Sequence, residues 1–238
     1  MHKSSIELQG NIANTLLSDA VFRPMLFSTP MVKALLNGTK TQTRRICPVQ
    51  PIDNRNWKHS ILVETTDKDE KKNVGKIHFC LLKNEFTIAE SDDRFFKPVA
   101  KVGDIIWVRE TYRDIEQDFG NPRYEYKATE NINLIDKWKP SLFMQKDACR
   151  LWLKVVNVRI EKLHQITDED ARSEGVEYST EFGYKLYSKN DFFSKHLSAS
   201  DSYMSLWEKI NGEGSWKSNP WVFVYEFEVI DGVPYGFR

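Results

Sequence analysis

Residues 38–45 contain a group of side chains that can bind an anion. The segment runs Gly-Thr-Lys-Thr-Gln-Thr-Arg-Arg, and it mixes three cations with three hydroxyls, namely Lys40, Arg44 and Arg45 with Thr39, Thr41 and Thr43. Guanidinium groups form forked hydrogen bonds to phosphate or carboxylate, and hydroxyls add further donors. The segment therefore indicates a phosphate- or carboxylate-binding site. The alternative is an ordinary basic strand that faces solvent, and composition alone favours it.

Motifs of common enzymes and metal sites are absent from the sequence. It has no Gly-x-x-x-x-Gly-Lys phosphate loop, no Gly-x-Ser-x-Gly and no His-Glu-x-x-His. The carboxylate pairs at Asp92 and Asp93 and at Asp168 and Asp170 are better explained as surface and as a helix cap than as metal ligands. The three cysteines and five histidines show no ligand spacing. We expect no metal and no cofactor.

Two of the tryptophans are candidates for stacking on a nucleobase. Trp138 and Trp216 lie in polar, turn-like contexts, whereas most of the seven tryptophans are expected in the core. Arg109 and Glu110 end an apolar run. They are expected either as an ion pair that orients a pocket or as a salt bridge at the rim of a barrel.

The elements that must position residues 38–45 are short. A buried strand at 25–27 should lead into a helix that is capped by Ser28 or Thr29, has Pro30 in its first turn and ends near Gly38. A second helix should begin after the cap Thr167, and a third should cover 203–210. Further strands are expected at 77–82, 105–110, 124–128, 150–160 and 221–229, with a bulge or two-sided burial near residue 155.

Composition is that of a globular protein with balanced charge. Lys and Arg number 34 and Asp and Glu number 34, so any nucleic-acid site must be a local patch. No run approaches about 18 apolar residues, so we expect no membrane span. The first residues do not form a secretory signal, and a cytoplasmic location is the simplest interpretation. Strands broken by short helices predict an α+β domain around a β-barrel or a curled sheet.

Several segments, in this order, resemble ASCH-domain proteins, specifically the longer type found in bacteriophages and prophages. The first are PMLFSTPMV at 24–32 and GTKTQTRR at 38–45, followed by VGD at 102–104 with WVRET at 107–111. Later ones are WKPS at 138–141, ITDEDA at 166–171, and the tryptophan-rich stretch from 206 to 222. The resemblance covers about residues 24–229.

The resemblance implies a PUA-like fold, which is a small β-barrel with short helices lining a cleft, plus insertions. It implies a single domain at 24–238 with an elaboration at about 54–97 and a variable loop at about 178–201. Residues 1–23 would be an N-terminal extension, either helical or flexible. The superfamily is associated with RNA, modified bases and nucleosides.

Some small ASCH proteins hydrolyse the acetyl amide of N4-acetylcytidine, and the positions that match their working residues are Lys40, Thr43 and Glu174. A lysine desolvated in a cleft can act as a base, and a threonine can attack the carbonyl or position a water. Glu174 would carry the proton to the leaving amine, and Arg45 or Arg109 would stabilise the oxyanion. Lys40 and Thr43 point to opposite faces of a regular strand, so they converge only if residues 40–42 turn.

Three functions are compatible with these residues and with the resemblance. The first is recognition of a nucleobase or modified nucleotide, of the RNA type, by a phage or prophage protein. The second is a metal-free amidohydrolase that acts on N4-acetylcytidine-like substrates, and the third is a protein-interaction accessory module with a vestigial cleft. The expected catalytic residues are Lys40, Thr43 and Glu174, and the expected nucleotide- or anion-binding residues are Thr41, Arg44, Arg45, Arg109, Trp138 and Trp216.

Overall fold

The computed structural model describes residues 21–50, 97–115, 124–129, 137–188 and 190–232, together with three strands at 60–64, 77–84 and 87–91. Most of the expected N-terminal extension at 1–23 therefore lies outside the described residues. Residues 22 and 23 belong to the first strand.

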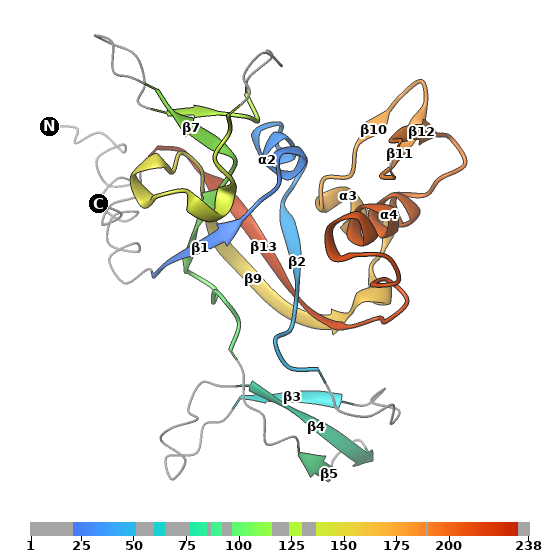
Figure 1. Ribbon diagram of the computed structural model, residues 1–238. Coiled ribbons are helices and arrows are strands. Elements are labelled where there is room, and N and C mark those ends of the chain that lie inside the picture. Colours follow the sequence, from blue (N-terminus) through green and yellow to red (C-terminus); the bar gives the residue numbers. More distant parts are fainter. Residues whose placement is uncertain are drawn as a thin grey trace, which may run out of the picture.

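A mixed five-stranded sheet forms the centre of the molecule (Figure 1). Its order is β1 (Phe22–Leu26), β6 (Ile105–Arg109), β9 (Trp152–Lys162), β13 (Trp221–Ile230) and β2 (Gln42–Ile46). β1 runs parallel to β6, and all other neighbours are antiparallel. Short helices accompany this sheet, so the predicted α+β class is confirmed.

The two longest strands, β9 and β13, pair along most of their length and carry the predicted bulge. The register changes between Glu226, which faces Asn157, and Phe227, which faces Val155. Val156 is therefore the extra residue on β9. Such a bulge increases the local twist, and both strands curve strongly in Figure 1.

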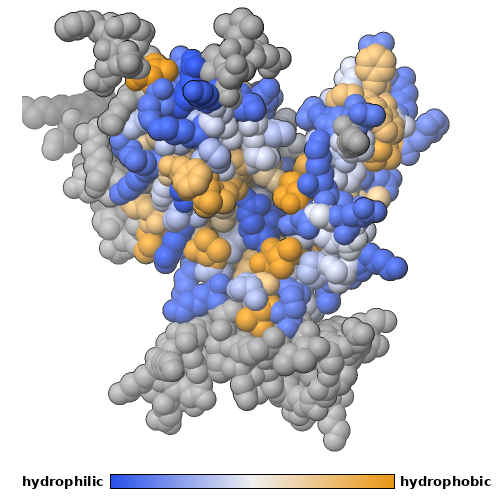
Figure 2. All heavy atoms as spheres, in the orientation of Figure 1, coloured by the Kyte–Doolittle hydropathy of each residue, from blue (hydrophilic) through white to orange (hydrophobic). Residues whose placement is uncertain are grey.

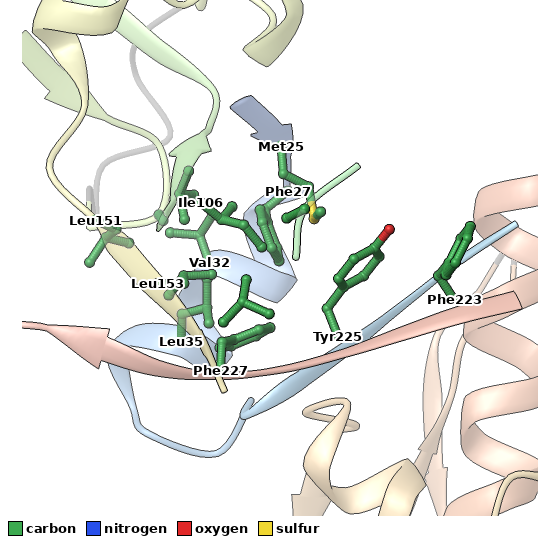
Figure 3. Packing of buried hydrophobic residues seen from close by; sticks show 14 of the residues in the cluster. Met25, Phe27, Val32, Leu35, Ile106, Leu151, Leu153, Phe223, Tyr225 and Phe227 are labelled. Carbon is green, nitrogen blue, oxygen red and sulfur yellow. The ribbon is translucent and has the colours of Figure 1, made fainter. Parts of the chain in front are cut away.

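The main core lies between α2 (Thr29–Leu36) and one face of the sheet (Figure 3). Val32 and Leu35 of the helix pack with Phe27, Leu153 and Phe227. The alternation along β13 predicted this face from the spacing of its aromatic residues. Burial of these side chains fixes α2, and therefore the chain that follows α2, against the sheet.

The opposite face of β13 is also covered, by α4 (Ala199–Asn211). Val222 and Val224 are fully buried in a second core with Leu206 and Trp207 of that helix. α4 begins four residues before the predicted start, because Ser198 caps it and Asp201 completes a capping box. The apolar spacing that predicted this helix starts only after that polar first turn.

α3 (Asp168–Ser173) ends against the chain that follows α2. Thr167 caps it as predicted, by accepting a hydrogen bond from the Asp170 amide at 3.1 Å. Gly175 follows in the left-handed region, with φ of 83°. This turn brings the end of α3 beside the segment that precedes β2.

The remaining elements form smaller units. β3 (Ser60–Glu64), β4 (Ile77–Asn84) and β5 (Thr87–Ser91) make an antiparallel sheet that lies apart from the central sheet in Figure 1, within the expected elaboration. Residues expected as a variable loop instead carry a three-stranded sheet of β10 (Tyr178–Ser179), β11 (Gly183–Leu186) and β12 (Phe192–Ser194). The others are β7 (Tyr112–Asp114), β8 (Tyr124–Tyr126), and the 3-10 turns η2 (Ser141–Phe143), η3 (Lys146–Ala148) and η4 (Leu163–Gln165).

Within the described part of the chain, no helix combines the length and the apolar character that crossing a bilayer requires.

Replacement of Gly175 by alanine should destabilise the fold by about 2–4 kcal/mol. A Cβ there would lie 2.7 Å from the Ala34 Cβ and 3.0 Å from the Lys40 Cβ, and the backbone is left-handed. Gly38→Ala is the matched control, because Gly38 is also left-handed but has open space around it, and should cost about 1 kcal/mol. Urea unfolding measures both, and equal losses would contradict the close contact.

Candidate functional site

Lys40 and Glu174 form a buried ion pair between the start of β2 and the end of α3. The Lys40 Nζ donates to Glu174 Oε2 at 2.9 Å and to the Glu174 carbonyl oxygen at 2.8 Å. The two side chains are 0% and 2% exposed. Their backbones also pair as an isolated antiparallel bridge. The expected meeting of these two residues is therefore present in the structure.

The turn after α2 aims Lys40 toward Glu174. Gly38 adopts φ of 71°, and the amides of Thr39 and Lys40 then both donate to the Ala34 carbonyl, at 2.9 and 3.1 Å. The Thr41 amide donates to the Ser173 carbonyl at 2.9 Å. These bonds fix the backbone of residues 39–41 to the end of α2 on one side and to the end of α3 on the other, and they thereby fix the direction of the Lys40 side chain.

Arg44 contacts the other oxygen of Glu174. Its Nη1 donates to Glu174 Oε1 at 3.0 Å, and its Nη2 lies 2.6 Å from Glu161 Oε1 and 3.2 Å from Asp170 Oδ2. The arginine side chain is completely buried. Composition alone favours a solvent-exposed Arg44. The structure can bury it because three carboxylates, supplied by β9 and by α3 with its C-terminal cap, compensate its charge.

The ion network continues along the same face of the sheet. The side-chain Nε2 of Gln42 donates to the backbone carbonyl and to the carboxylate of Asp170, both at 3.0 Å. Arg159 binds Asp170 at 2.7 Å and Glu161 at 3.1 Å, and it also pairs with Glu226. Each buried charge of this network thus has an oppositely charged partner, as burial requires.

Burial and neighbouring charge shift the pKa values of this network in different directions. Desolvation lowers the pKa of Lys40, and the attraction of Glu174 only partly opposes that. Burial would lower the pKa of Arg44, but the carboxylates of Glu174 and Glu161 outweigh it and raise the value. Burial would raise the pKa of Asp170, but hydrogen bonds from Gln42 and the charge of Arg44 bring it below its usual value.

A hollow with about 60 Å³ accessible to water opens at the outer edge of β2. Its polar wall is formed by Arg44, Arg45 and Glu174. In Figure 2, hydrophilic side chains lie in a depression between the surface of α2 and that of α3 and α4, with hydrophobic side chains along both sides. The rest of the lining is Met31, Ile46, Tyr203, Leu206, Trp207, Ile210 and Asn211.

Arg45 is the partly exposed cation of the hollow. Its Nη2 donates to the Leu26 carbonyl at 2.7 Å, its Nη1 donates to the Arg44 carbonyl at 3.4 Å, and its guanidinium lies 5.2 Å from the centre of the Phe27 ring. Burial lowers the pKa of Arg45 below its usual value, against the attraction of Glu174. Because Leu26 ends β1, this side chain links the two edge strands of the sheet.

Thr43 lies apart from Lys40 and Glu174. It stands between Gln42 and Arg44 in β2, so its side chain points to the opposite face of the strand. Its hydroxyl is fully buried and has no hydrogen-bond partner among the described residues. Neither Thr43 nor Lys40 lines the hollow, and Thr41 is exposed. The structure therefore joins Glu174 to Lys40, Arg44 and the wall that contains Arg45.

The other expected binding residues lie outside the hollow. The Arg109 guanidinium lies 5.5 Å from the centre of the Trp107 ring and donates to the Leu142 carbonyl. Trp138 lies under the guanidinium of Arg113, at 5.5 Å. Trp216 stacks on His164 at 4.9 Å, so that ring is used in packing.

Glu110 pairs with Arg150, not with Arg109 as expected from the sequence. It is buried and binds Arg150 through two hydrogen bonds of 2.8 and 2.9 Å. This bidentate pair fixes the end of β6 and lies apart from the hollow.

The contribution of α4 to the hollow was not predicted from the sequence. The spacing of Tyr203, Leu206 and Ile210 predicts one face of a helix, but nothing in that spacing indicates that the face borders a ligand site. The described residues contain no group of three or more His, Cys, Asp or Glu side chains arranged to hold a metal ion.

Searches against family models, curated proteins and solved structures each returned no match for this chain.

The Asp170 carboxylate should make the free energy of unfolding depend on pH in the acidic range. Because its folded-state pKa is lowered, its contribution is present above pH 3.8 and is lost as pH falls below that value. Asp170→Asn should therefore cost about 1–3 kcal/mol at pH 7, and the gap from the wild type should narrow between about pH 4 and pH 2.5. Thermal unfolding across that range measures the gap.

Glu169→Gln is the control for that experiment. This neighbouring carboxylate is 79% exposed, and its ion-pair partner among the described residues is Arg172 at the surface, so its replacement should change stability by at most about 0.5 kcal/mol. A gap for Asp170→Asn that stayed constant to the acid end of the range would contradict the assignment.

Proposed function

We propose that the hollow recognises a nucleobase of an RNA-type or modified nucleotide. One observation carries this proposal: the Glu174 carboxylate is fixed by Lys40 and Arg44 at the wall of a hollow that also contains a guanidinium. Carboxylates accept hydrogen bonds from the exocyclic amino groups of bases, and a carboxylate oxygen has more than one acceptor site. Glu174 can therefore accept hydrogen bonds from Lys40, from Arg44 and from the amino group of a base at the same time.

The remaining walls suit a flat, partly apolar ligand. Leu206, Trp207 and Ile210 supply apolar surface, and such surface with a few placed polar groups is typical of small-molecule sites. The buried Tyr203 ring completes this wall, and the Arg44 guanidinium lies 5.9 Å from its centre.

The resemblance to ASCH-domain proteins supports the same proposal. It implies a PUA-like barrel, and the link from Arg45 to the Leu26 carbonyl, which connects the two edge strands, is consistent with such closure. A phage or prophage origin, a cytoplasmic location and an RNA-type ligand belong to this proposal as well.

A larger side chain placed in the hollow should weaken nucleoside and nucleotide binding without disturbing the ion network. Ile210 lines the hollow and is 49% exposed, so Ile210→Trp should place an indole in it and weaken binding of cytidine and cytidine 5′-monophosphate at least tenfold. Lys209→Trp is the matched control, because Lys209 precedes it on the same helix and pairs at the surface with Asp191. Calorimetric titration measures both, and equal affinity in the two variants would overturn the proposal.

A metal-free amidohydrolase of N4-acetylcytidine is the second candidate. The contact between Lys40 and Glu174, which fixes the carboxylate beside the hollow, favours it. In this arrangement a water in the hollow would attack the acetyl carbonyl. Glu174 would take the water proton and return it to the amine of cytosine as the amide bond breaks. Lys40 would hold the carboxylate in position.

Hydrolysis would then depend on Lys40 and hardly on Thr43. Lys40→Ala should lower the rate of acetate and cytidine release at least about 100-fold. Thr43→Val should keep it within threefold, because Thr43 does not line the hollow. Chromatography of the products measures the rates, and near-ultraviolet circular dichroism checks that both variants fold. If the wild type and Lys40→Ala are equally inert, this candidate is rejected.

A further inference from the structure

Arg45 differs from the other cations around the hollow in having no carboxylate partner. Lys40, Arg44 and Arg159 each contact at least one carboxylate. Among the described residues, the Arg45 guanidinium donates only to two backbone oxygens. The three other cations share the four carboxylates Glu161, Asp170, Glu174 and Glu226, so the Arg45 guanidinium is left without a direct ion-pair partner among the described residues.

A guanidinium without a direct ion-pair partner in a partly buried site favours an anionic ligand. Desolvation of a charge is unfavourable unless an opposite charge or hydrogen bonds replace the water. A guanidinium has five N–H donors in a fixed fork, and the two backbone bonds leave donors free for a phosphate. The Phe27 ring on one side holds the guanidinium in place.

The two polar groups that a ligand would contact differ in depth: Glu174 lies deeper in the hollow than Arg45. Glu174 is 2% exposed, whereas Arg45 is partly exposed at the edge strand. A ligand that uses both must place its hydrogen-bond donor deep and its anionic group nearer to solvent. A nucleotide has this polarity, with amino groups on the base and a charged phosphate at the other end.

We infer that the hollow binds a phosphorylated ligand, with the base edge at Glu174 and a phosphate at Arg45, rather than an uncharged nucleoside. This inference rests on the proposed function. The phosphate can belong to a free mononucleotide or to a strand, and both present the same anion to the guanidinium.

The test compares cytidine, cytidine 5′-monophosphate, the trinucleotide CpCpC and inorganic phosphate by calorimetric titration. The monophosphate should bind about 10- to 100-fold more tightly than cytidine, as expected for charge-assisted hydrogen bonds. Its affinity should fall with salt at a log–log slope near one or below. A trinucleotide that binds more tightly than the monophosphate indicates a strand as the source, and equal affinities indicate a free nucleotide.

Arg45→Met should remove the preference for phosphate. It keeps an apolar stem of similar length but no charge, so the advantage of the monophosphate over cytidine should disappear. Arg23→Met is the control, because it removes the same charge from a residue that pairs with Asp104 outside the hollow. Arg45→Lys, which keeps the charge, provides a second variant should the methionine variant be unfolded, and should retain part of the preference.

The outcomes separate the two proposals. Equal affinity of cytidine and its monophosphate in the wild type overturns the phosphate inference and leaves nucleobase recognition in place. A preference for phosphate that persists in Arg45→Met also overturns it. Absence of binding by every nucleoside and nucleotide overturns the proposed function, and tight binding of inorganic phosphate alone would then assign a plain anion site to Arg45.

Discussion

The contact of one carboxylate with two cations organises the region around the hollow. Glu174 lies at the C-terminal cap of α3, Lys40 leads into β2, and Arg44 lies within β2, so their contacts join segments more than 100 residues apart. Removal of one member of a buried ion pair leaves an uncompensated charge, at a cost of about 3–5 kcal/mol. The positions of β2, α3 and the hollow wall therefore depend on each other.

The hydrophobic cores explain why this arrangement can persist. α2 is fixed to one face of the sheet and α4 to the other, and both helices contribute side chains to the hollow. Arg44, Arg45 and Glu174 project from segments that these helices hold. The polar wall is thus supported by packed elements, and a ligand would meet groups that are already positioned.

Local signals in the sequence predicted much of the fold. The start of α2 near Ser28 or Thr29, the cap at Thr167, the bulge near residue 155 and the alternating aromatic residues of β13 all depend on neighbours within a few residues. The burial of Arg44 depends on carboxylates more than 100 residues away, so composition favoured solvent for it. Lys40 and Glu174 were paired only through resemblance to ASCH-domain proteins. The alternation of a regular strand placed Thr43 on the face opposite to Lys40, but nothing in the sequence placed α4 beside them.

The most direct test of the central claim is a crystal structure of the protein with cytidine 5′-monophosphate. We predict that the ligand lies between β2 and α4, with the base amino group within hydrogen-bond distance of Glu174 and the phosphate on Arg45. A ligand bound elsewhere, with the hollow occupied only by water, would contradict this claim.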